Sequence, residues 1–94
     1  MVYIVKQDQF THGKPHEVWQ SDDGLVTTDR DAAIREARGN WEYLTHREQT
    51  TTAIYVVGFA TGELSAAEWL DTIYHDGGDI GDPVEYIPIS PNSF

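Results

Sequence analysis

The 94-residue sequence contains no cysteine, and none of its apolar runs approaches the roughly 20 residues of a membrane helix. Without thiols the chain has no disulfide framework, no zinc–thiolate site and no thiol chemistry. The first residues, Met1 to Lys6, are typical of a strand and lack the basic n-region of a secretory signal. We therefore expect one domain, residues 1–94, in a reducing cytoplasm.

Basic side chains are also scarce, and the second half of the chain has none. Sixteen acids against six bases give a formal net charge of −10. Residues 1–47 hold eight acids and all six bases, a net of −2, whereas residues 48–94 hold eight acids and no base, a net of −8. Contacts to phosphate need Lys and Arg, so direct binding to nucleic acid or to an anionic membrane is disfavoured. A basic protein surface is the partner that this charge favours.

The longest apolar run, Ala53 to Ala60, predicts the centre of a β-sheet. It is rich in β-branched and aromatic side chains and carries no charge, which is typical of a strand buried on both faces. The other predicted strands are Val2–Val5, Glu17–Ser21, Leu25–Thr27 and Val84–Ile89. Asp22-Asp23-Gly24 predicts a hairpin turn, and the polar stretch Gln7 to His16 predicts a loop. Pro83 and Pro88 cannot donate ladder hydrogen bonds, so the last strand is expected at a sheet edge.

Two helices are predicted. The first begins at Thr28-Asp29-Arg30-Asp31, and Gly39-Asn40 either ends it or weakens it. Its apolar stripe is formed by Ala33, Ile34, Ala37, Trp41 and Leu44. Thr45 to Thr52 is expected to be a polar connection. Ser65-Ala66-Ala67-Glu68 is a capping box that opens the second helix, and Asp76-Gly77-Gly78 stops it.

This order of elements, β-β-β-α-β-α-β, predicts an α+β fold. We expect a small, mainly antiparallel sheet of about four to five strands with two helices packed on one face. Residues 90–94 are expected to form a loose tail.

No residue pattern in the sequence pairs a nucleophile with a base, so the chain is predicted not to be an enzyme and no cofactor is expected. His12 and His16 have the spacing of two ligands on a helix, but Gly13 and Pro15 argue against a helix there. The Gly-rich stretch from Gly77 to Gly81 follows a helix and is flanked by acids. In a phosphate site the glycines lead into a helix, and acids do not flank them.

The loop from Asp76 to Glu85 suggests an alternative function, calcium or small-ligand binding. Asp76, Asp79 and Asp82 stand at steps of three, with Glu85 close behind. Calcium takes several oxygen ligands, which such a loop could supply, although the spacing differs from that of an EF-hand. Acids that are present for turn geometry and solubility explain the loop more simply.

The acids of the second half also suggest a binding surface for a protein partner. Seven of them lie within 23 consecutive positions that contain no base: Glu63, Glu68, Asp71, Asp76, Asp79, Asp82 and Glu85. A fixed row of carboxylates can imitate a track of DNA phosphates and steer the chain towards basic clefts. A related alternative uses exposed aromatics, namely Tyr43, Tyr74, Tyr86 or a tryptophan, with acids at the rim. The charge could also serve solubility alone, and exposed sheet edges leave a homodimer open.

At the level of the whole chain, this sequence resembles the small, acidic, cysteine-free proteins that phages encode, among them anti-CRISPR proteins. The resemblance lies in size and charge, and in the order of the Val2–Val5 strand, a hairpin, the helix start at Thr28 and the Ile54–Phe59 strand. It implies a non-enzymatic inhibitor in the cytoplasm of a host cell. Such an inhibitor would act as a DNA mimic and block a basic, nucleic-acid-binding surface of a defence complex such as Cascade or Cas9.

Overall fold

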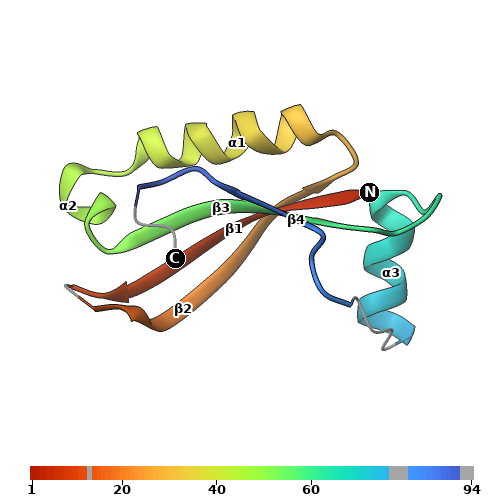
Figure 1. Ribbon diagram of the computed structural model, residues 1–94, viewed down its shortest axis with the longest axis horizontal. Helices are drawn as coiled ribbons and strands as arrows, with labels where there is room; N and C mark the ends of the chain where they lie inside the picture. The colour runs from red at the N-terminus through yellow and green to blue at the C-terminus, as the bar shows by residue number, and fades with distance from the viewer. Residues whose placement is uncertain (13, 77–80, 92–94) are drawn as a thin grey trace.

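The computed structural model of the chain describes residues 1–12, 14–76 and 81–91. It is an α+β fold, as the sequence predicts, built on a four-stranded antiparallel sheet in the order β2-β1-β3-β4 (Figure 1). The strands are β1 (Val2–Thr11), β2 (Lys14–Thr27), β3 (Thr52–Phe59) and β4 (Glu85–Pro88). The helices are α1 (Arg30–Tyr43), α2 (His46–Gln49) and α3 (Ala66–Asp76).

Strand β3 lies in the interior of the sheet, between β1 and β4, which confirms the prediction for the longest apolar run. Every β3 residue except Tyr55 is buried; α1 covers one face of the strand, and α3 covers the end of the other. Alternate residues therefore enter two separate apolar clusters. Ile54 and Val56 point to one face, and Val57 and Phe59 point to the other.

The hairpin predicted at Asp22-Asp23-Gly24 is wrong. Residues Lys14 to Thr27 form one continuous strand that pairs with β1, and the predicted loop Gln7 to His16 instead contains the end of one strand and the start of the next. Gly24 and Leu25 together oppose Val5, so the Asp-Gly signal marks a β-bulge in place of a turn. Both a bulge and a turn use glycine, and sequence alone does not separate them.

Helix α1 covers one face of the sheet. Ala33 and Ala37 are fully buried against Tyr3, Val5, Ile54 and Val56, with Trp41 and Leu44 packed at the margin. The N-cap is Asp29, whose carboxylate accepts the amide hydrogen of Ala32 at 3.1 Å, so the cap lies one residue after the predicted Thr28. Gly39 does not end the helix; it lies on the exposed side within it.

The connection after α1 contains a short helix that the sequence analysis missed. Thr45 and Glu48 form a reciprocal capping box: the Glu48 amide donates to Thr45 Oγ1 at 3.2 Å, and the Thr45 amide donates to Glu48 Oε1 at 3.0 Å. The signal was present in the sequence as Thr-x-x-Glu. The four-residue α2 that follows has no buried residue and serves to turn the chain into β3.

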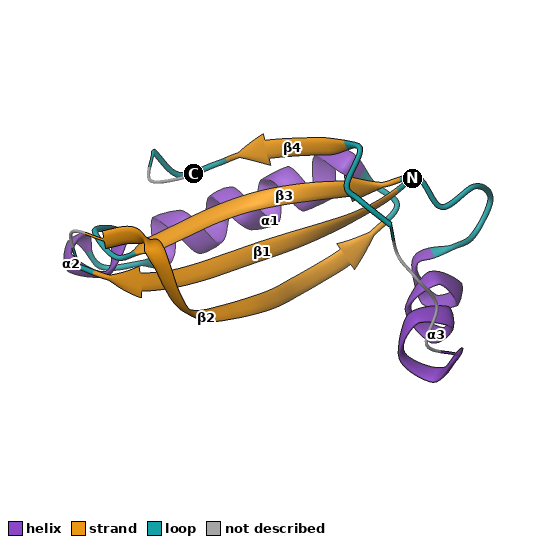
Figure 2. Ribbon diagram, turned by 60° about the horizontal axis from the view of Figure 1, so that its bottom comes forward, coloured by secondary structure: helices purple, strands orange, loops and turns teal. Residues whose placement is uncertain are grey.

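Helix α3 lies on the opposite side of the sheet from α1, at the end where the N-terminus lies (Figures 1 and 2). Trp69 is its buried contact residue, and its ring centroid is 5.4 Å from that of Phe59. The predicted capping box is confirmed, because the Ser65 amide donates to Glu68 Oε2 at 2.9 Å and the Glu68 amide donates to Ser65 Oγ at 3.2 Å. The two helices thus cover different faces of the sheet, and the prediction that both pack on one face is wrong, because the central strands present apolar side chains on both faces.

Strand β4 occupies a sheet edge, as Pro83 and Pro88 predict. Ser90, the first residue of the predicted tail, is buried and continues the strand pairing. Its Oγ accepts the Ile54 amide hydrogen at 3.0 Å, and its own amide donates to the Ile54 carbonyl at 3.1 Å. Residues 92–94 lie outside the described part. Within that part, every helix is too short or too polar to pass through a bilayer.

Candidate binding surface

One face of the sheet is open over most of its length. Helix α1 fills one face and α3 reaches only the end of the other, as Figure 2 shows by looking onto the open side with α1 behind the strands. We call this open side the uncovered face. Its polar and aromatic side chains come from all four strands: Lys6, Asp8, Ser21, Asp23, Tyr55 and Tyr86.

A buried carboxylate lies at the centre of the uncovered face. Asp8 is only 6% exposed, and both its oxygens accept hydrogen bonds, Oδ1 from Ser21 Oγ at 2.7 Å and Oδ2 from the Tyr55 hydroxyl at 2.8 Å. Burial, and then the Asp8 carboxylate, raise the pKa of the Tyr55 phenol, so this phenol remains a donor. The network links β2, β1 and β3, and it fixes the polar groups in place before any partner arrives.

An ion pair lies further along the same strands. Lys6 Nζ donates to Asp23 Oδ1 at 2.8 Å, and both side chains are partly exposed. Because the bulge at Gly24 shifts the register, Asp23 lies directly across from Lys6. The pair neutralises this part of the face and leaves the Asp8 carboxylate as its unbalanced charge.

An apolar strip lies on the β4 side of Tyr55. Tyr86 is 45% exposed and lies against Tyr55, with ring centroids 5.2 Å apart and planes inclined by 39°. Val84, two residues earlier, is 60% exposed, and Pro88 is exposed as well. We call Val84, Tyr86 and Pro88 the apolar strip. A tyrosine that presents both an apolar ring and a hydroxyl is a frequent anchor of protein interfaces.

The seven acids singled out in the sequence do not serve one purpose in the structure. Glu63 and Asp82 are exposed in loops, and Asp71 is exposed on α3. Glu68 is turned back onto Ser65 in the capping box. Asp79 lies outside the described residues, and nothing is described of the Asp76 side chain.

Glu85, the last of the seven, belongs to the face that α1 covers. Arg30 at the start of α1 binds it through Nη2 at 2.7 Å and Nε at 2.8 Å, and this hydrogen bonding lowers the pKa of the Glu85 carboxyl. The pair ties α1 to β4. Because its carboxylate binds Arg30, Glu85 is removed from the set of oxygen ligands predicted for calcium. Among the described residues, no group of three or more histidine and acidic side chains could hold a metal ion.

The aromatics named as alternative contact residues are divided between the core and the surface. Trp41 and Trp69 pack against the two apolar clusters, whereas Tyr43 at the end of α1 is 91% exposed and Trp19 on β2 is 63% exposed. Tyr86 packs against Tyr55, whose hydroxyl donates to the buried carboxylate. The Tyr74 side chain is not among those described.

Sequence reasoning did not anticipate Asp8 or Tyr55 as site residues. Tyr55 is the one hydroxyl-bearing side chain inside the central apolar run, which is a signal that a polar partner faces it. Asp8 carried no comparable signal, because the bulge that brings Ser21 opposite it is not visible in the sequence.

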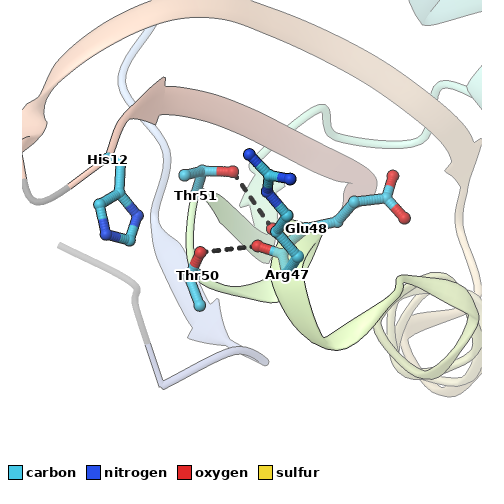
Figure 3. Close-up of a pocket in the computed structure, with 5 residues that line it drawn as sticks. All are labelled: His12, Arg47, Glu48, Thr50 and Thr51. Atoms are coloured by element: carbon cyan, nitrogen blue, oxygen red, sulfur yellow. Dashed lines mark hydrogen bonds between the residues drawn. The ribbon is translucent and has the colours of Figure 1, made fainter.

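A pocket of about 490 Å³ lies at the other end of the molecule, between the β1–β2 turn and α2, lined by His12, Arg47, Glu48, Thr50 and Thr51 (Figure 3). Its two hydroxyls end α2: Thr50 Oγ1 donates to the Arg47 carbonyl at 2.6 Å and Thr51 Oγ1 to the Glu48 carbonyl at 3.4 Å. Hydrogen bonds from Thr45 lower the pKa of the Glu48 carboxyl. The side chains of Glu48, Thr50 and Thr51 therefore stabilise the ends of α2. Among the described residues, no hydrogen bond joins any of them to His12.

Comparisons with protein-family models, with curated proteins and with solved structures gave no match.

Proposed function

We propose that this chain is a non-enzymatic binding protein that docks a basic protein surface onto the uncovered face. The observation that carries the proposal is the exposed Tyr86 ring, which packs against Tyr55 on the sheet side that α3 covers only at one end, while the Tyr55 hydroxyl donates to the buried Asp8 carboxylate. An aromatic platform next to a fixed carboxylate suits an arginine, whose guanidinium stacks on rings and bonds to carboxylates.

The exposure of each side chain indicates how much it would contribute to the binding free energy of such an interface. The apolar strip would be desolvated at the centre and contribute most of the affinity, because buried aromatic anchors dominate interfaces. The exposed acids Glu63, Asp71 and Asp82 would stay at the rim, where they raise the association rate and contribute less to the final affinity. The net charge of −10 acts over a longer range and favours encounters with basic surfaces.

In its narrower form the proposal is an anti-CRISPR-type inhibitor that occupies the DNA-binding surface of a host effector complex. Its support is the whole-chain resemblance to small acidic phage proteins, together with a second half that has no basic residue. A DNA-binding cleft is rich in Lys and Arg, so it has the charge complementary to this chain.

Competition with DNA tests the narrower form. Purified Cas9 with its guide RNA, and purified Cascade, are each mixed with labelled target duplex and increasing amounts of this protein. We expect the protein to displace the duplex from one of the two complexes, and Tyr86→Ala to weaken that inhibition by about tenfold, the effect of losing one anchor. Unchanged DNA binding by both complexes would refute the anti-CRISPR form.

Matched charge reversals test the broader form. Glu63→Lys with Asp82→Lys changes the rim of the proposed surface, whereas Glu36→Lys with Glu42→Lys makes the same change in net charge on the exposed side of α1. Proteins captured from a bacterial lysate on the immobilised chain are quantified by mass spectrometry. A true partner should be basic. Its capture should be lost with Tyr86→Ala and with the Glu63→Lys, Asp82→Lys variant, and it should be retained with the Glu36→Lys, Glu42→Lys variant. Partners retained equally by all variants would contradict the assignment of this surface.

A further inference from the structure

We propose that the pocket beside α2 binds a small molecule that carries a carboxylate, and that Arg47 is the residue that holds this carboxylate. The pocket has a volume of about 490 Å³, which is within the range of small-molecule sites, about 300–1,000 Å³. None of its lining residues belongs to the uncovered face or to the apolar strip. The inference is therefore independent of the proposed function.

Hydrogen bonds hold the walls of this pocket in place. The Thr51 carbonyl accepts the amide hydrogen of Phe10 at 3.0 Å, which fixes the segment after α2 to β1. Gln49 Nε2 donates to the Trp41 carbonyl at 3.0 Å, which ties α2 to the last turn of α1. Because α2 and the segment that follows it are each fixed to a neighbouring element, the pocket is largely preformed, and little binding free energy would be lost in ordering it.

Arg47 brings a positive charge to this pocket that no acid offsets. Among the described residues, its guanidinium has no carboxylate within ion-pair distance, whereas three of the chain's other bases each bind an acid. The acid in the lining is Glu48, whose carboxylate accepts the amide hydrogen of Thr45 at 3.0 Å and extends away from His12 in Figure 3. Within the described part of the chain, the side chains of Arg47 and His12 also make no hydrogen bond. Their donors are therefore available to a ligand.

The chemistry of these donors fits a carboxylate. A guanidinium presents its N–H groups in a planar fork that matches the two oxygens of a carboxylate, and the His12 ring can donate one further hydrogen bond. A phosphate monoester would carry about two negative charges, and the net charge of −10 opposes its approach more strongly. Glu48 adds to this repulsion, because hydrogen bonds from Thr45 lower its pKa and keep it ionised. The pocket therefore favours a ligand with a single negative charge.

Titration of the isotope-labelled full chain with benzoate, followed by amide NMR spectra, tests the proposal. We expect saturable shifts of the Thr50 and Thr51 amide signals with a dissociation constant on the order of 1 mM, a strength typical of so small a ligand. Benzamide has the same shape without the charge and should not shift these signals. Phenyl phosphate should bind more weakly than benzoate.

Substitutions of arginine test the role of Arg47. Arg47→Gln should weaken the binding of benzoate by about tenfold or more, because the charged fork is lost. Arg38→Gln is the matched control, since it makes the same change in net charge on the exposed side of α1 and should leave the affinity unchanged. Arg47→Lys keeps the charge without the fork, so its affinity should lie between those of Arg47→Gln and the wild type. An unchanged melting temperature of each variant shows that the fold is intact.

Three results would overturn the proposal. The first is the absence of any saturable shift with benzoate, and the second is an equal response to benzoate and benzamide. The third is an affinity for benzoate that Arg47→Gln leaves unchanged or that Arg38→Gln reduces as much. Tighter binding of phenyl phosphate than of benzoate would overturn the assignment of the ligand as a carboxylate.

Discussion

The two faces of this sheet differ in what covers them and in what they contain. The face under α1 is filled with apolar side chains, among them Ile54 and Val56, both fully buried. The uncovered face shares the same strands but holds the Asp8 network and an exposed tyrosine. Apolar burial is the main source of stability, whereas buried polar networks mainly fix geometry. The difference therefore separates a face that is apolar along its length from a face that is apolar at the end under α3 and polar beyond it.

The largest expected effect comes from the covered face. Ile54→Ala removes a fully buried side chain from the central strand and leaves a cavity under α1. We expect the free energy of unfolding to fall by about 2–5 kcal/mol, measured by urea denaturation. A loss below about 1 kcal/mol would mean that the core can collapse around the cavity and that this face is less tightly packed than described.

A pair of glycine substitutions sharpens the comparison within the covered face. A Cβ at Gly58 would lie 2.9 Å from Tyr3 Cε1 and 3.1 Å from Tyr3 Cδ1, so Gly58→Ala forces the ring to move and should cost about 1–3 kcal/mol. Gly39→Ala meets no atom within 4 Å in the middle of α1 and should stabilise the chain by up to about 1 kcal/mol. Opposite shifts of the two melting temperatures would confirm the prediction, and equal shifts would refute it.

On the uncovered face, Tyr55→Phe removes one donor from the buried Asp8 carboxylate and keeps the ring. We expect a loss of about 1–3 kcal/mol, because a buried acceptor loses a partner. Tyr43→Phe removes a hydroxyl from a side chain that is 91% exposed and should have no effect. If both variants unfold like the wild type in urea, water replaces the phenol at Asp8 and the face is more open than its burial indicates.

The smallest effect is the pH dependence from the Arg30–Glu85 pair. Because Arg30 lowers the pKa of the Glu85 carboxyl in the folded chain, the pair stabilises the fold fully above the unfolded pKa of a glutamate, and this contribution is lost as pH falls through the folded pKa. The difference in urea midpoint between wild type and Glu85→Gln should therefore be present at neutral pH and close on acidification. A difference that persists at low pH would show that Glu85 acts through packing.

The sequence predicted those elements whose signals are local. The apolar run of β3, the capping box at Ser65 and the prolines around β4 each determine their own structure within a few residues, and each prediction was confirmed. Apart from α2, whose local Thr-x-x-Glu signal was overlooked, the missed features depend on pairing between distant segments. Whether Asp22-Asp23-Gly24 forms a turn or a bulge is decided by β1, and whether Asp8 is buried is decided by Ser21 and Tyr55.

For the same reason, the candidate site was predicted only in part. Net charge was legible in the chain, because it does not depend on tertiary contacts, whereas Tyr86 was named only as one of several aromatics. The internal role of Glu85 was not legible, since it depends on the distant Arg30, whereas the role of Glu68 was predicted as part of the Ser65 capping box. Counting acids therefore overestimated how many carboxylates are free to meet another protein.

The clasp between Ser90 and Ile54 holds the end of β4 to the sheet from outside the strand itself. Serine supplies two hydrogen bonds after β4 ends at Pro88, one through its amide and one through its side chain. Because the Ile54 amide is buried, cleavage of the chain before Ser90 would leave that donor without its acceptor. The anchoring of this edge strand therefore depends in part on one hydroxyl group that lies beyond its last residue.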